Sequence, residues 1–363
     1  MTAGLRVLCL TNMWPGPTDP DFGAFVADMC GALEVRGMTV DPVVIDRRGG
    51  GLARTSAKYA SLAARAARHA RRADVVYAHF LFPTGAAAAV AARAARIPFV
   101  VTAHGQDVRN LERPAVRRAS ALALRGAAEL IAVSHHLAGA LADSGLALPP
   151  VSVIDMGVDM ERFRPGDRGA ARTRLGLPPG DPLVLAVGGL TDRKNPLGLL
   201  QAFARVRATR PGARLAFVGD GPLAHALERG SRRLGVADAV LRPGALPHEA
   251  VADWIAACDV LALVSRVEPL GIAALEALAG GRPVVATAIG GTREVVPDPQ
   301  AGRIVDPLDP GAIARGILDL LDDPPSPEAC RAAAESHSLT RQAARVAAVL
   351  ERAVERRAAT HAR

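Results

Sequence analysis

Residues 260–287 read VLALVSRVEPLGIAALEALAGGRPVVAT, and the order of elements within them indicates the fold class. It begins with the apolar run Val260–Leu263, continues through a loop into a helix near Leu270, and returns to an apolar run at Pro283–Ala286. Short apolar runs of this kind are typical of strands buried on both faces of a parallel sheet. Two such strands joined by a crossover helix form a βαβ unit, so the stretch predicts an α/β protein.

The same alternation of strand and helix continues in both directions along the chain. In the C-terminal half of the chain the predicted strands are Leu183–Val187, Leu215–Val218, Val240–Leu241, Val260–Leu263, Pro283–Ala286 and Gly302–Val305. Toward the N-terminus they are Leu5–Leu10, Val40–Ile45, Val75–Ala78, Phe99–Ala103 and Leu130–Val133, with a helix over Ala24–Arg36. Residues 163–181 are rich in Arg, Gly and Pro, and we interpret them as a linker. The pattern therefore predicts two doubly wound α/β domains of similar size.

A length of 363 residues agrees with two domains of roughly 150 residues or more. We assign residues 1–165 to an N-terminal domain and residues 166–338 to a C-terminal domain. An alanine- and arginine-rich helix is expected over 339–357, packing back on the first domain. Ligands of such sheets bind beyond the carboxyl ends of the strands, so the loops after the strands are the candidate sites.

The composition excludes several classes of protein. Half of the residues are apolar and 22% are charged, which rules out a disordered chain, collagen and a coiled coil. The four cysteines form no CxxC pair and no cluster with histidine, which argues against a disulfide scaffold and a zinc site and fits a reducing compartment. The first residues indicate a buried strand rather than a signal peptide, and no apolar run is long enough to span a membrane. The sequence therefore predicts a cytoplasmic protein.

The formal net charge of +8 raises the question of a nucleic-acid partner. Almost all of this charge is arginine dispersed among alanines, which is typical of solvated helix surfaces, and we expect no nucleic-acid binding. One stretch, residues 47–72, contains no acidic residue. Helical spacing places one stripe along it: Arg54, Lys58, Ser61, Arg65, Arg68 and Arg72. Such a stripe is consistent with solvated surface and with peripheral contact at the inner face of an anionic membrane.

Two common nucleotide-binding signatures are missing. No predicted strand leads into G-x-G-x-x-G, since residues 218–222 read VGDGP and lack the third glycine. No Walker loop is present either. Hydride transfer with a dinucleotide and P-loop chemistry are therefore excluded.

Two features of the C-terminal domain indicate an anion site instead. Arg193 and Lys194 follow a predicted strand directly and precede a helix that begins near Pro196. The helix that opens near Leu270 would leave first-turn backbone N–H groups unpaired, which suits a phosphate without a metal ion. Glu268 and Glu276 bracket that helix start, and carboxylates accept hydrogen bonds from vicinal hydroxyls. Each residue taken alone is equally consistent with an ordinary surface charge or helix glutamate.

Together these motifs resemble those of the retaining nucleotide-sugar glycosyltransferases of family 4, which have the GT-B fold. The E-x7-E signature of that family stands here as EPLGIAALE, from Glu268 to Glu276. Further matching segments follow the family's order and spacing: VTAHGQDV (101–108), IAVSHHL (131–137), IDMGVDMERFRP (154–165), VGDGP (218–222), ALEALAGGRPVVAT (274–287) and GGTREVV (290–296). The resemblance covers nearly the whole chain and implies two Rossmann-like domains that face a central cleft.

The resemblance also implies roles for residues of the C-terminal domain. Glu268 would hold hydroxyls of the donor sugar, and Glu276 would hold the ribose hydroxyls. Lys194, with Arg193 beside it, would neutralise the diphosphate. Backbone amides would bind the distal phosphate, and these belong to Leu270, Gly271 and Ile272.

In the N-terminal domain the resemblance points to three residues. His104 matches the family histidine near C6 of the sugar and the reacting centre, although a buried structural histidine is the alternative. Asp107 lies close enough in sequence to orient His104 or an acceptor hydroxyl. Gly23, in the loop after the first strand, would contribute to donor binding.

The chain departs from the family pattern at two positions. The family often has an arginine where this chain has Gly189, so the phosphate charge must be met by Arg193 or by one cation fewer. The usual asparagine before Gly157 is Met156, a change that we expect to leave the interdomain contact intact.

The sequence thus predicts metal-independent, retaining transfer of a sugar from a nucleotide diphosphate sugar to a hydroxyl, with no cofactor. No DxD metal motif is evident, and UDP-sugar and GDP-sugar both remain open as donors. The acceptor is also open, among a lipid-linked sugar, a phospholipid and a small secondary metabolite. The alternative function is a non-catalytic GT-B-like adaptor that binds membrane or nucleic acid. The presence of Glu268, Glu276, Lys194 and His104 argues against that adaptor.

Overall fold

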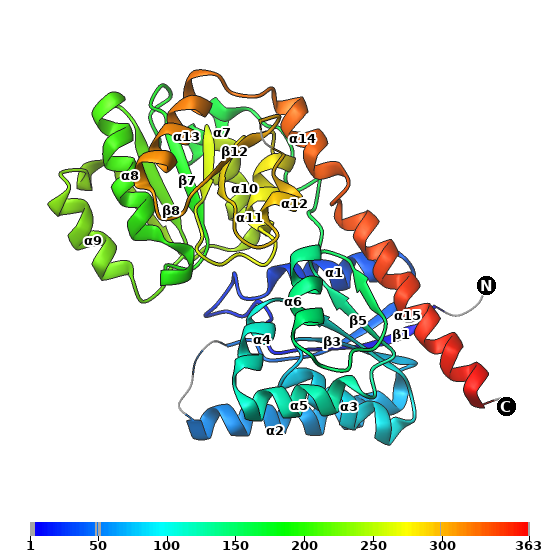
Figure 1. The fold of residues 1–363 in the computed structure, drawn as a ribbon. Coiled ribbons are helices and arrows are strands. Elements are labelled where there is room, and N and C mark those ends of the chain that lie inside the picture. The colour runs from blue at the N-terminus through cyan, green and yellow to red at the C-terminus, as the bar shows by residue number, and fades with distance from the viewer. Residues whose placement is uncertain (1–3, 48, 50–51, 298, 362–363) are drawn as a thin grey trace. The chain divides into compact units, whose positions relative to one another are not determined.

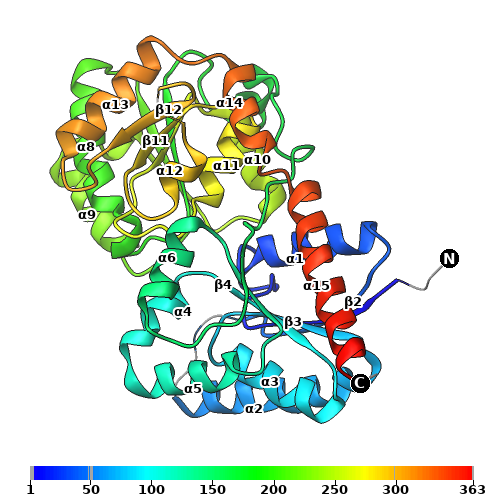
Figure 2. The same ribbon diagram turned by 45° about the vertical axis from the view of Figure 1, so that its right-hand side comes forward.

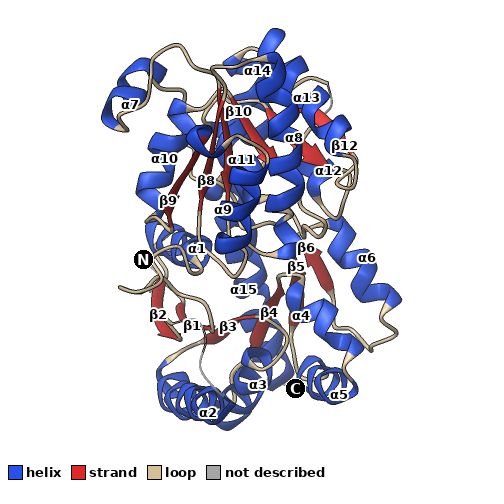
Figure 3. Cartoon of the chain, turned by 90° about the vertical axis from the view of Figure 1, so that its left-hand side faces the viewer, coloured by secondary structure: helices blue, strands red, loops and turns tan. Residues whose placement is uncertain are grey.

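The computed structural model describes residues 4–47, 49, 52–297 and 299–361, and describes only the backbone of residues 52–55 and 360–361. The chain divides into two compact units, Met1–Gly157 together with Leu339–Arg363, and Val158–Ser338 (Figure 1). In each unit, six parallel strands form one sheet between layers of helices (Figure 3). The predicted α/β class, with two Rossmann-like doubly wound sheets, is confirmed.

The sheet of the first unit has the strand order β2-β1-β3-β4-β5-β6. Its strands are β1 (Arg6–Thr11), β2 (Thr39–Val44), β3 (Val75–His79), β4 (Phe99–Ala103), β5 (Glu129–Ala132) and β6 (Val151–Val153). Strand β2 lies on one side of β1, and every later strand is added on the other side. The order therefore reverses between β1 and β3, and ligands of open α/β sheets bind at such a reversal.

Helices cover both faces of this sheet (Figures 1 and 2). One face carries α1 (Ala24–Val35) and α15 (Leu339–His361), which contact each other. The other face carries α2 (Leu52–His69), α3 (Thr84–Ala95) and α5 (Pro114–Leu124). The short elements are η1 (Ala70–Arg72), α4 (Gln106–Arg109), η2 (Asn110–Glu112) and α6 (His135–Asp143). Although α15 follows the second unit in sequence, it belongs to the first, and its buried side chains include Val346 and Leu350.

The sheet of the second unit has the strand order β12-β11-β10-β7-β8-β9. Its strands are β7 (Leu183–Val187), β8 (Arg214–Val218), β9 (Val240–Gly244), β10 (Val260–Leu263), β11 (Val284–Thr287) and β12 (Gly302–Val305). The helical elements are α7 (Arg168–Arg174), η3 (Asp192–Lys194), α8 (Pro196–Thr209), α9 (Ala224–Arg233), η4 (Ala237–Ala239), α10 (His248–Ala257), α11 (Ile272–Ala279), α12 (Thr292–Val295), α13 (Pro310–Asp322) and α14 (Pro327–Glu335). Here the order reverses between β7 and β10, which are hydrogen-bonded neighbours.

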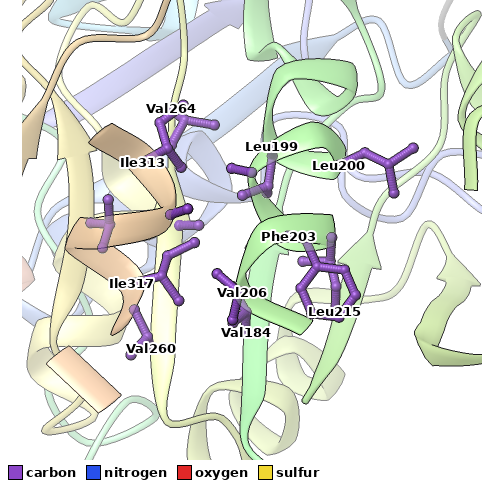
Figure 4. Packing of buried hydrophobic residues seen from close by; sticks show 14 of the residues in the cluster. Val184, Leu199, Leu200, Phe203, Val206, Leu215, Val260, Val264, Ile313 and Ile317 are labelled. Atoms are coloured by element: carbon purple, nitrogen blue, oxygen red, sulfur yellow. The ribbon is translucent and has the colours of Figure 1, made fainter. Parts of the chain in front are cut away.

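Apolar packing fixes β7 and β10 relative to the helices of their unit. Helices α8 and α13 lie on the same face of the sheet, and their side chains interlock over it (Figure 4). Phe203 of α8 and Ile317 of α13 are fully buried, together with Val184 of β7 and Val260 of β10. Burial of one such side chain contributes about 1.5–3 kcal/mol. This core therefore supports the two strand ends that carry the residues of the candidate site.

The predicted linker over residues 163–181 is wrong, because it contains helix α7 and a buried core residue. Phe163 is only 2% exposed. The Asp167 carboxylate accepts a hydrogen bond from the Ala170 N–H and thereby caps α7. Arg172 is buried because its guanidinium pairs with Asp259 at 2.6 Å. The composition of the segment suggested an exposed linker because its arginines had no visible partners nearby in sequence.

The second unit begins before the boundary that the sequence suggested. Residues 158–165, which we assigned to the N-terminal domain, lie in the second unit. Val158 forms a β-bridge with Ser338, and its N–H donates to His337 at 2.9 Å. These bonds join the first and last residues of the unit. None of the described helices combines the length and apolar composition that a membrane crossing requires.

Candidate active site

The loops after β7 and β10 bring Lys194 and Glu268 together at the reversal point of the second sheet. Lys194 Nζ donates to Glu268 Oε2 at 2.6 Å, and Ser265 Oγ donates to the same oxygen at 2.9 Å. Glu268 is nearly buried, with 8% of its side chain exposed, whereas 24% of the Lys194 side chain is exposed. Glu268 Oε1 has no hydrogen-bond partner among the described residues. The pair therefore presents a reachable cation beside a carboxylate oxygen that still accepts.

Asn195 anchors the loop that carries Lys194. It has a left-handed backbone (φ 55°), which asparagine tolerates better than most residues. Its buried side-chain amide donates to Val264 O at 3.3 Å and to Pro307 O at 2.9 Å. The loop after β7 is thus tied to the end of β10, and Lys194 is held against Glu268. The sequence predicted only that a helix begins near the next residue, Pro196, and gave no sign of this anchoring role of Asn195.

The loop after β11 holds the backbone of Glu268. Gly291 N–H donates to Glu268 O at 3.1 Å. Gly290 has φ 67°, and a Cβ atom at that position would lie 1.7 Å from Glu268 O. Only glycine allows this approach, so the GGTREVV segment positions the first glutamate of the E-x7-E signature.

Helix α11 begins beside Glu268 with free backbone donors. Gly271 precedes it at φ 108°, and a Cβ atom there would lie 3.0 Å from Leu263 Cδ2. Gly271 O accepts from Ala274 and Leu275, whereas the N–H groups of Ile272 and Ala273 have no partner among the described residues. The Leu270 side chain is buried, so only its backbone is available to a ligand. Unpaired first-turn N–H groups with the helix dipole behind them form an anion site.

Glu276 lies within α11, and its nearest polar partner is His248. His248 Nε2 is 2.6 Å from Glu276 Oε1, and Arg162 Nη1 is 2.9 Å from His248 Nδ1. A guanidinium can only donate, so Nδ1 must accept and the imidazole proton must lie on Nε2. Nε2 then donates to Glu276, whose Oε2 has no partner among the described residues. Sequence reasoning missed both Arg162 and His248.

A pocket opens at the carboxyl ends of β7 and β10. Its lining includes Gly188, Gly189, Lys194 and Ser265. Gly188 has φ 130°, and a Cβ atom there would lie 3.9 Å from Lys194 Nζ. Arg193 precedes Lys194 in η3, and its carbonyl accepts from Arg266 N–H at 2.8 Å. Gly189, where the family often has arginine, therefore forms part of the pocket wall.

In the first unit, His104 follows β4 and contacts a second histidine that sequence reasoning missed. His79 Nδ1 and His104 Nε2 are 3.0 Å apart. The rings of Phe25 and Phe80 pack on His104 with centroid distances of 5.4 and 4.8 Å. Burial lowers the pKa of His104 to about 3, so the ring is neutral at pH 7.

The proton of His104 can be placed from its partner. His79 Nε2 is buried without a hydrogen-bond partner among the described residues. Unpaired N–H groups are rarer in proteins than unpaired acceptors, so we assign the proton of His79 to Nδ1. His79 then donates to His104 Nε2, and His104 carries its proton on Nδ1. That N–H is the group of His104 able to donate to a ligand.

Asp107 acts on the backbone of its own loop. Its Oδ1 accepts from the N–H groups of His104, Gly105 and Val108 at 2.8–3.1 Å, and its Oδ2 accepts from Leu81 N–H at 3.0 Å. Burial raises the pKa of Asp107, while these four hydrogen bonds oppose the shift. The carboxylate thus joins the loops after β3 and β4 and orients His104 through the chain. Both of its oxygens are already engaged by backbone donors.

Gly23 is required where the loop after β1 enters α1. It has φ 75°, and a Cβ atom there would lie 2.6 Å from the Met13 backbone. The glycine therefore lets the loop close on itself and places Phe25, in the first turn of α1, against His104. Among the described residues, no group of three or more His, Cys, Asp or Glu side chains is arranged to hold a metal ion.

Both halves of the chain match families of sugar-transferring proteins. Residues 2–162 match Glycosyltransferase Family 4, and residues 167–337 match Glycosyl transferases group 1. A D-inositol 3-phosphate glycosyltransferase of Thermobispora bispora is 34% identical over 315 residues, which cover 78% of this chain and 72% of the relative. The chain belongs to glycosyltransferase family 4.

Other relatives of this glycosyltransferase match over a shorter range. D-inositol 3-phosphate glycosyltransferase 2 of Catenulispora acidiphila is 41% identical over 184 residues, and the match spans 48% of this chain and 43% of that relative. Among solved structures, Anabaena HepE in complex with UDP and glucose has a TM-score of 0.80 at 22% identity, covering 96% of this chain and 99% of that one. WaaG, a glycosyltransferase involved in lipopolysaccharide biosynthesis, has a TM-score of 0.73 at 18% identity, and the match covers 95% of this chain and 99% of WaaG. At these identities the two structures show a shared GT-B fold.

Proposed function

We propose that this glycosyltransferase moves a sugar from a nucleotide diphosphate sugar to an acceptor hydroxyl, with retention of configuration and without a metal ion. The observation that carries the proposal is the Lys194–Glu268 ion pair at the reversal point of the second sheet. Unpaired N–H groups at the start of α11 lie next in the chain. The ammonium and these amides offer positive charge to a diphosphate, and Glu268 Oε1 offers an acceptor to a sugar hydroxyl.

The charge distribution of the site suits a departing diphosphate. When the bond between the anomeric carbon and the phosphate oxygen breaks, negative charge grows on the diphosphate. An ammonium has three donors, so Lys194 can hold Glu268 and a phosphate oxygen together. Because Asn195 fixes the loop, this cation is oriented before the reaction, which is where electrostatic catalysis gains most.

Metal independence is proposed from the groups that surround the anion site. A divalent ion would have to compete with Lys194 for Glu268 and with His248 for Glu276. The ammonium, the neighbouring Arg193 and the first-turn amides of α11 supply positive charge of the kind that a metal ion would otherwise bring.

Retention is proposed to follow from attack on the same face that the diphosphate leaves. The acceptor oxygen forms the new bond to the anomeric carbon, the carbon–oxygen bond to the diphosphate breaks, and the acceptor proton passes to a diphosphate oxygen. Glu268 is an unsuitable nucleophile, because its Oε2 already accepts hydrogen bonds from Lys194 Nζ and Ser265 Oγ. No pair of free acid and base carboxylates is needed for this route.

UDP-sugar is proposed as the donor, with support from the UDP complexes of structures that share the fold. A phosphorylated polyol is proposed as the first acceptor to test, because the relatives are named as D-inositol 3-phosphate glycosyltransferases. The test is thermal stabilisation by UDP-, GDP-, ADP- and TDP-sugars, followed by NMR of the anomeric proton in the product formed with D-inositol 3-phosphate. UDP-sugar is expected to give the largest shift, and the product is expected to keep the donor's anomeric configuration. An inverted product would contradict retention, and absence of any shift would favour the non-catalytic adaptor.

Peripheral contact with an anionic membrane is proposed for one helix of the first unit. In α2, Leu62 and Ala66 are buried, whereas Arg65 and Arg68 are exposed, and Arg71 and Arg72 follow with exposed side chains. Lys58 is half-buried and donates to Gly49 O at 2.8 Å. Arg48 and the side chain of Arg54 lie outside the described residues. Since the apolar side packs into its own unit, contact with lipid would be electrostatic and without insertion.

A further inference from the structure

Three side chains of the second unit form a hydrogen-bonded row that ends at Glu276. Arg162 lies in the segment before α7, His248 begins α10, and Glu276 lies in α11. The separations are 2.9 Å from Arg162 Nη1 to His248 Nδ1 and 2.6 Å from His248 Nε2 to Glu276 Oε1. The ring of Phe163 packs on the imidazole at a centroid distance of 5.2 Å. Residues from three separate segments thus fix one carboxylate.

The row determines which oxygen of Glu276 remains available. Only 7% of the Glu276 side chain and 15% of the His248 side chain are exposed. With Arg162 donating to Nδ1, His248 is held in the tautomer that donates from Nε2, and Oε1 of Glu276 is occupied. Oε2 is the oxygen with no partner among the described residues.

We propose that His248 is a positioning residue for nucleotide recognition, holding Glu276 so that Oε2 accepts from the ribose hydroxyls of the donor. Arg162 acts behind it by keeping the imidazole in the donating tautomer. This inference rests on the proposed function, since it assigns the ribose to Glu276. It predicts that the gain in affinity from the ribose hydroxyls depends on a hydrogen-bond donor at position 248.

A purely structural contact between α10 and α11 would not require these polar side chains. Apolar side chains would join two helices without the cost of removing a carboxylate and a guanidinium from water. A polar row with one unused carboxylate oxygen is useful where a ligand hydroxyl completes it. The two roles can be distinguished by measurement. Loss of a purely structural helix contact would weaken binding of all ligands alike, whereas loss of a ribose contact would weaken only binding of ligands that carry ribose hydroxyls.

The test measures binding of UDP, 2′,3′-dideoxy-UDP and inorganic pyrophosphate by calorimetry to the full chain. Variants are His248→Leu, which keeps apolar bulk beside Phe163 but has no donor, and His248→Gln, whose amide can donate to Glu276 and accept from Arg162. Glu249→Ala is the matched control, because Glu249 is exposed in the same helical turn. His248→Ala replaces His248→Leu if the latter does not fold, as judged by circular dichroism.

Wild-type protein is expected to prefer UDP over the dideoxy analogue by roughly tenfold or more, since two hydrogen bonds are lost. In His248→Leu this preference should fall to about twofold, with pyrophosphate binding unchanged within about twofold. His248→Gln and Glu249→Ala should keep most of the preference. A full preference in His248→Leu would overturn the inference, as would a wild-type protein that does not distinguish UDP from its dideoxy analogue while binding both. Failure of wild-type protein to bind either UDP or pyrophosphate would instead overturn the proposed function itself.

Discussion

Among single residues, Lys194 is the one that the proposed function makes respond to charge that changes during the reaction. Its ammonium already neutralises Glu268 at 2.6 Å, and in the proposed function a diphosphate shares the same group. A cation that meets a growing negative charge lowers the barrier more than it strengthens ground-state binding. Its contribution should therefore be larger in kcat than in KM for the donor.

Lys194→Ala is expected to lower kcat by about 10²–10³-fold, as loss of one electrostatic contact to a developing anion does. The measurement is steady-state transfer with UDP-sugar as the varied substrate. Lys58→Ala is the matched control, because Lys58 is the only other lysine of the sequence and lies in the first unit. A loss of less than about fivefold in kcat would identify Lys194 as an ordinary surface charge.

His104 should make the protein less stable in acid. The folded-state pKa of about 3 lies below the ordinary value of 6.5, so between these values the unfolded chain binds the additional proton. The free energy of unfolding therefore falls as pH drops below about 6.5, and one pH unit lower this histidine accounts for a loss on the order of 1 kcal/mol. His104→Gln should flatten the dependence of stability on pH, measured by urea denaturation between pH 7.5 and 5. An unchanged slope would show that His104 titrates alike in both states.

Candidate site residues that directly follow a strand could be predicted from the sequence. Hydrogen-bond partners that are distant in the chain could not. Lys194, Glu268 and Gly271 belong to segments that resemble family motifs, and the structure places them around one strand reversal. His248 carries no such signal, because its role depends on a contact with Glu276 that only tertiary packing creates. His79 had one usable sign, since it is a polar residue at the end of a buried strand.

At the scale of elements, buried strands were the most predictable parts of the chain. Phe99–Ala103, Leu183–Val187 and Val260–Leu263 have the predicted bounds, because near-continuous apolar runs mark central parallel strands. Gly302–Val305 also has the predicted bounds, although it is the edge strand β12 and contains Arg303. Strand β6 was missed, since its three residues lie at the sheet edge and none is fully buried. Helix α7 was missed because arginine-rich composition concealed the ion pair that buries Arg172.

Gly290→Ala should both destabilise the protein and weaken donor binding. A Cβ atom would lie 1.7 Å from Glu268 O, and the left-handed backbone adds strain, so we expect a loss of roughly 2–4 kcal/mol in unfolding free energy. Because the loop must then move away from Glu268, affinity for UDP-sugar should fall as well. Gly180→Ala is the control, since Gly180 is exposed in the same unit and nothing lies within 4 Å of its added Cβ. Urea denaturation measures the unfolding free energy, and calorimetric titration measures the affinity for UDP-sugar. Equal values of both quantities in the two variants would show that Gly290 is not needed to position Glu268.

In the whole molecule, the two sheets differ in strand order, and each has one point at which the order reverses. The first sheet reverses between β1 and β3, beside the loops of Gly23 and His79, and the second reverses between β7 and β10. The sequence predicted two such sheets from the alternation of elements. The compact unit that holds the second sheet begins at Val158, eight residues before the predicted boundary, because a backbone bond between Val158 and His337 has no local signature.

The basic face of α2 should bind anionic vesicles at low salt and release them near 0.3 M salt. Each arginine near a charged surface contributes about 1 kcal/mol, and salt screens this attraction. Co-sedimentation with phosphatidylglycerol vesicles is the measurement, and neutral vesicles should bind nothing. Simultaneous Gln substitution of Arg65, Arg68, Arg71 and Arg72 should abolish binding without changing donor affinity. Substitution of Arg229, Arg232 and Arg233 in α9 is the charge control, and an equal loss there would show that net charge alone is responsible.

The proposed function requires that the second unit bind a nucleotide diphosphate with its own cation and helix amides. Calorimetric titration of UDP into the full chain, in excess EDTA and again with Mg²⁺, tests it most directly. We predict dissociation constants that agree within about twofold in the two buffers, and at least tenfold weaker binding by Lys194→Ala in both, since an ion pair to phosphate is lost. Binding that disappears in EDTA and returns with Mg²⁺ would show a metal-dependent diphosphate site, and binding that is unaffected by Lys194→Ala would show that Lys194 does not hold the diphosphate.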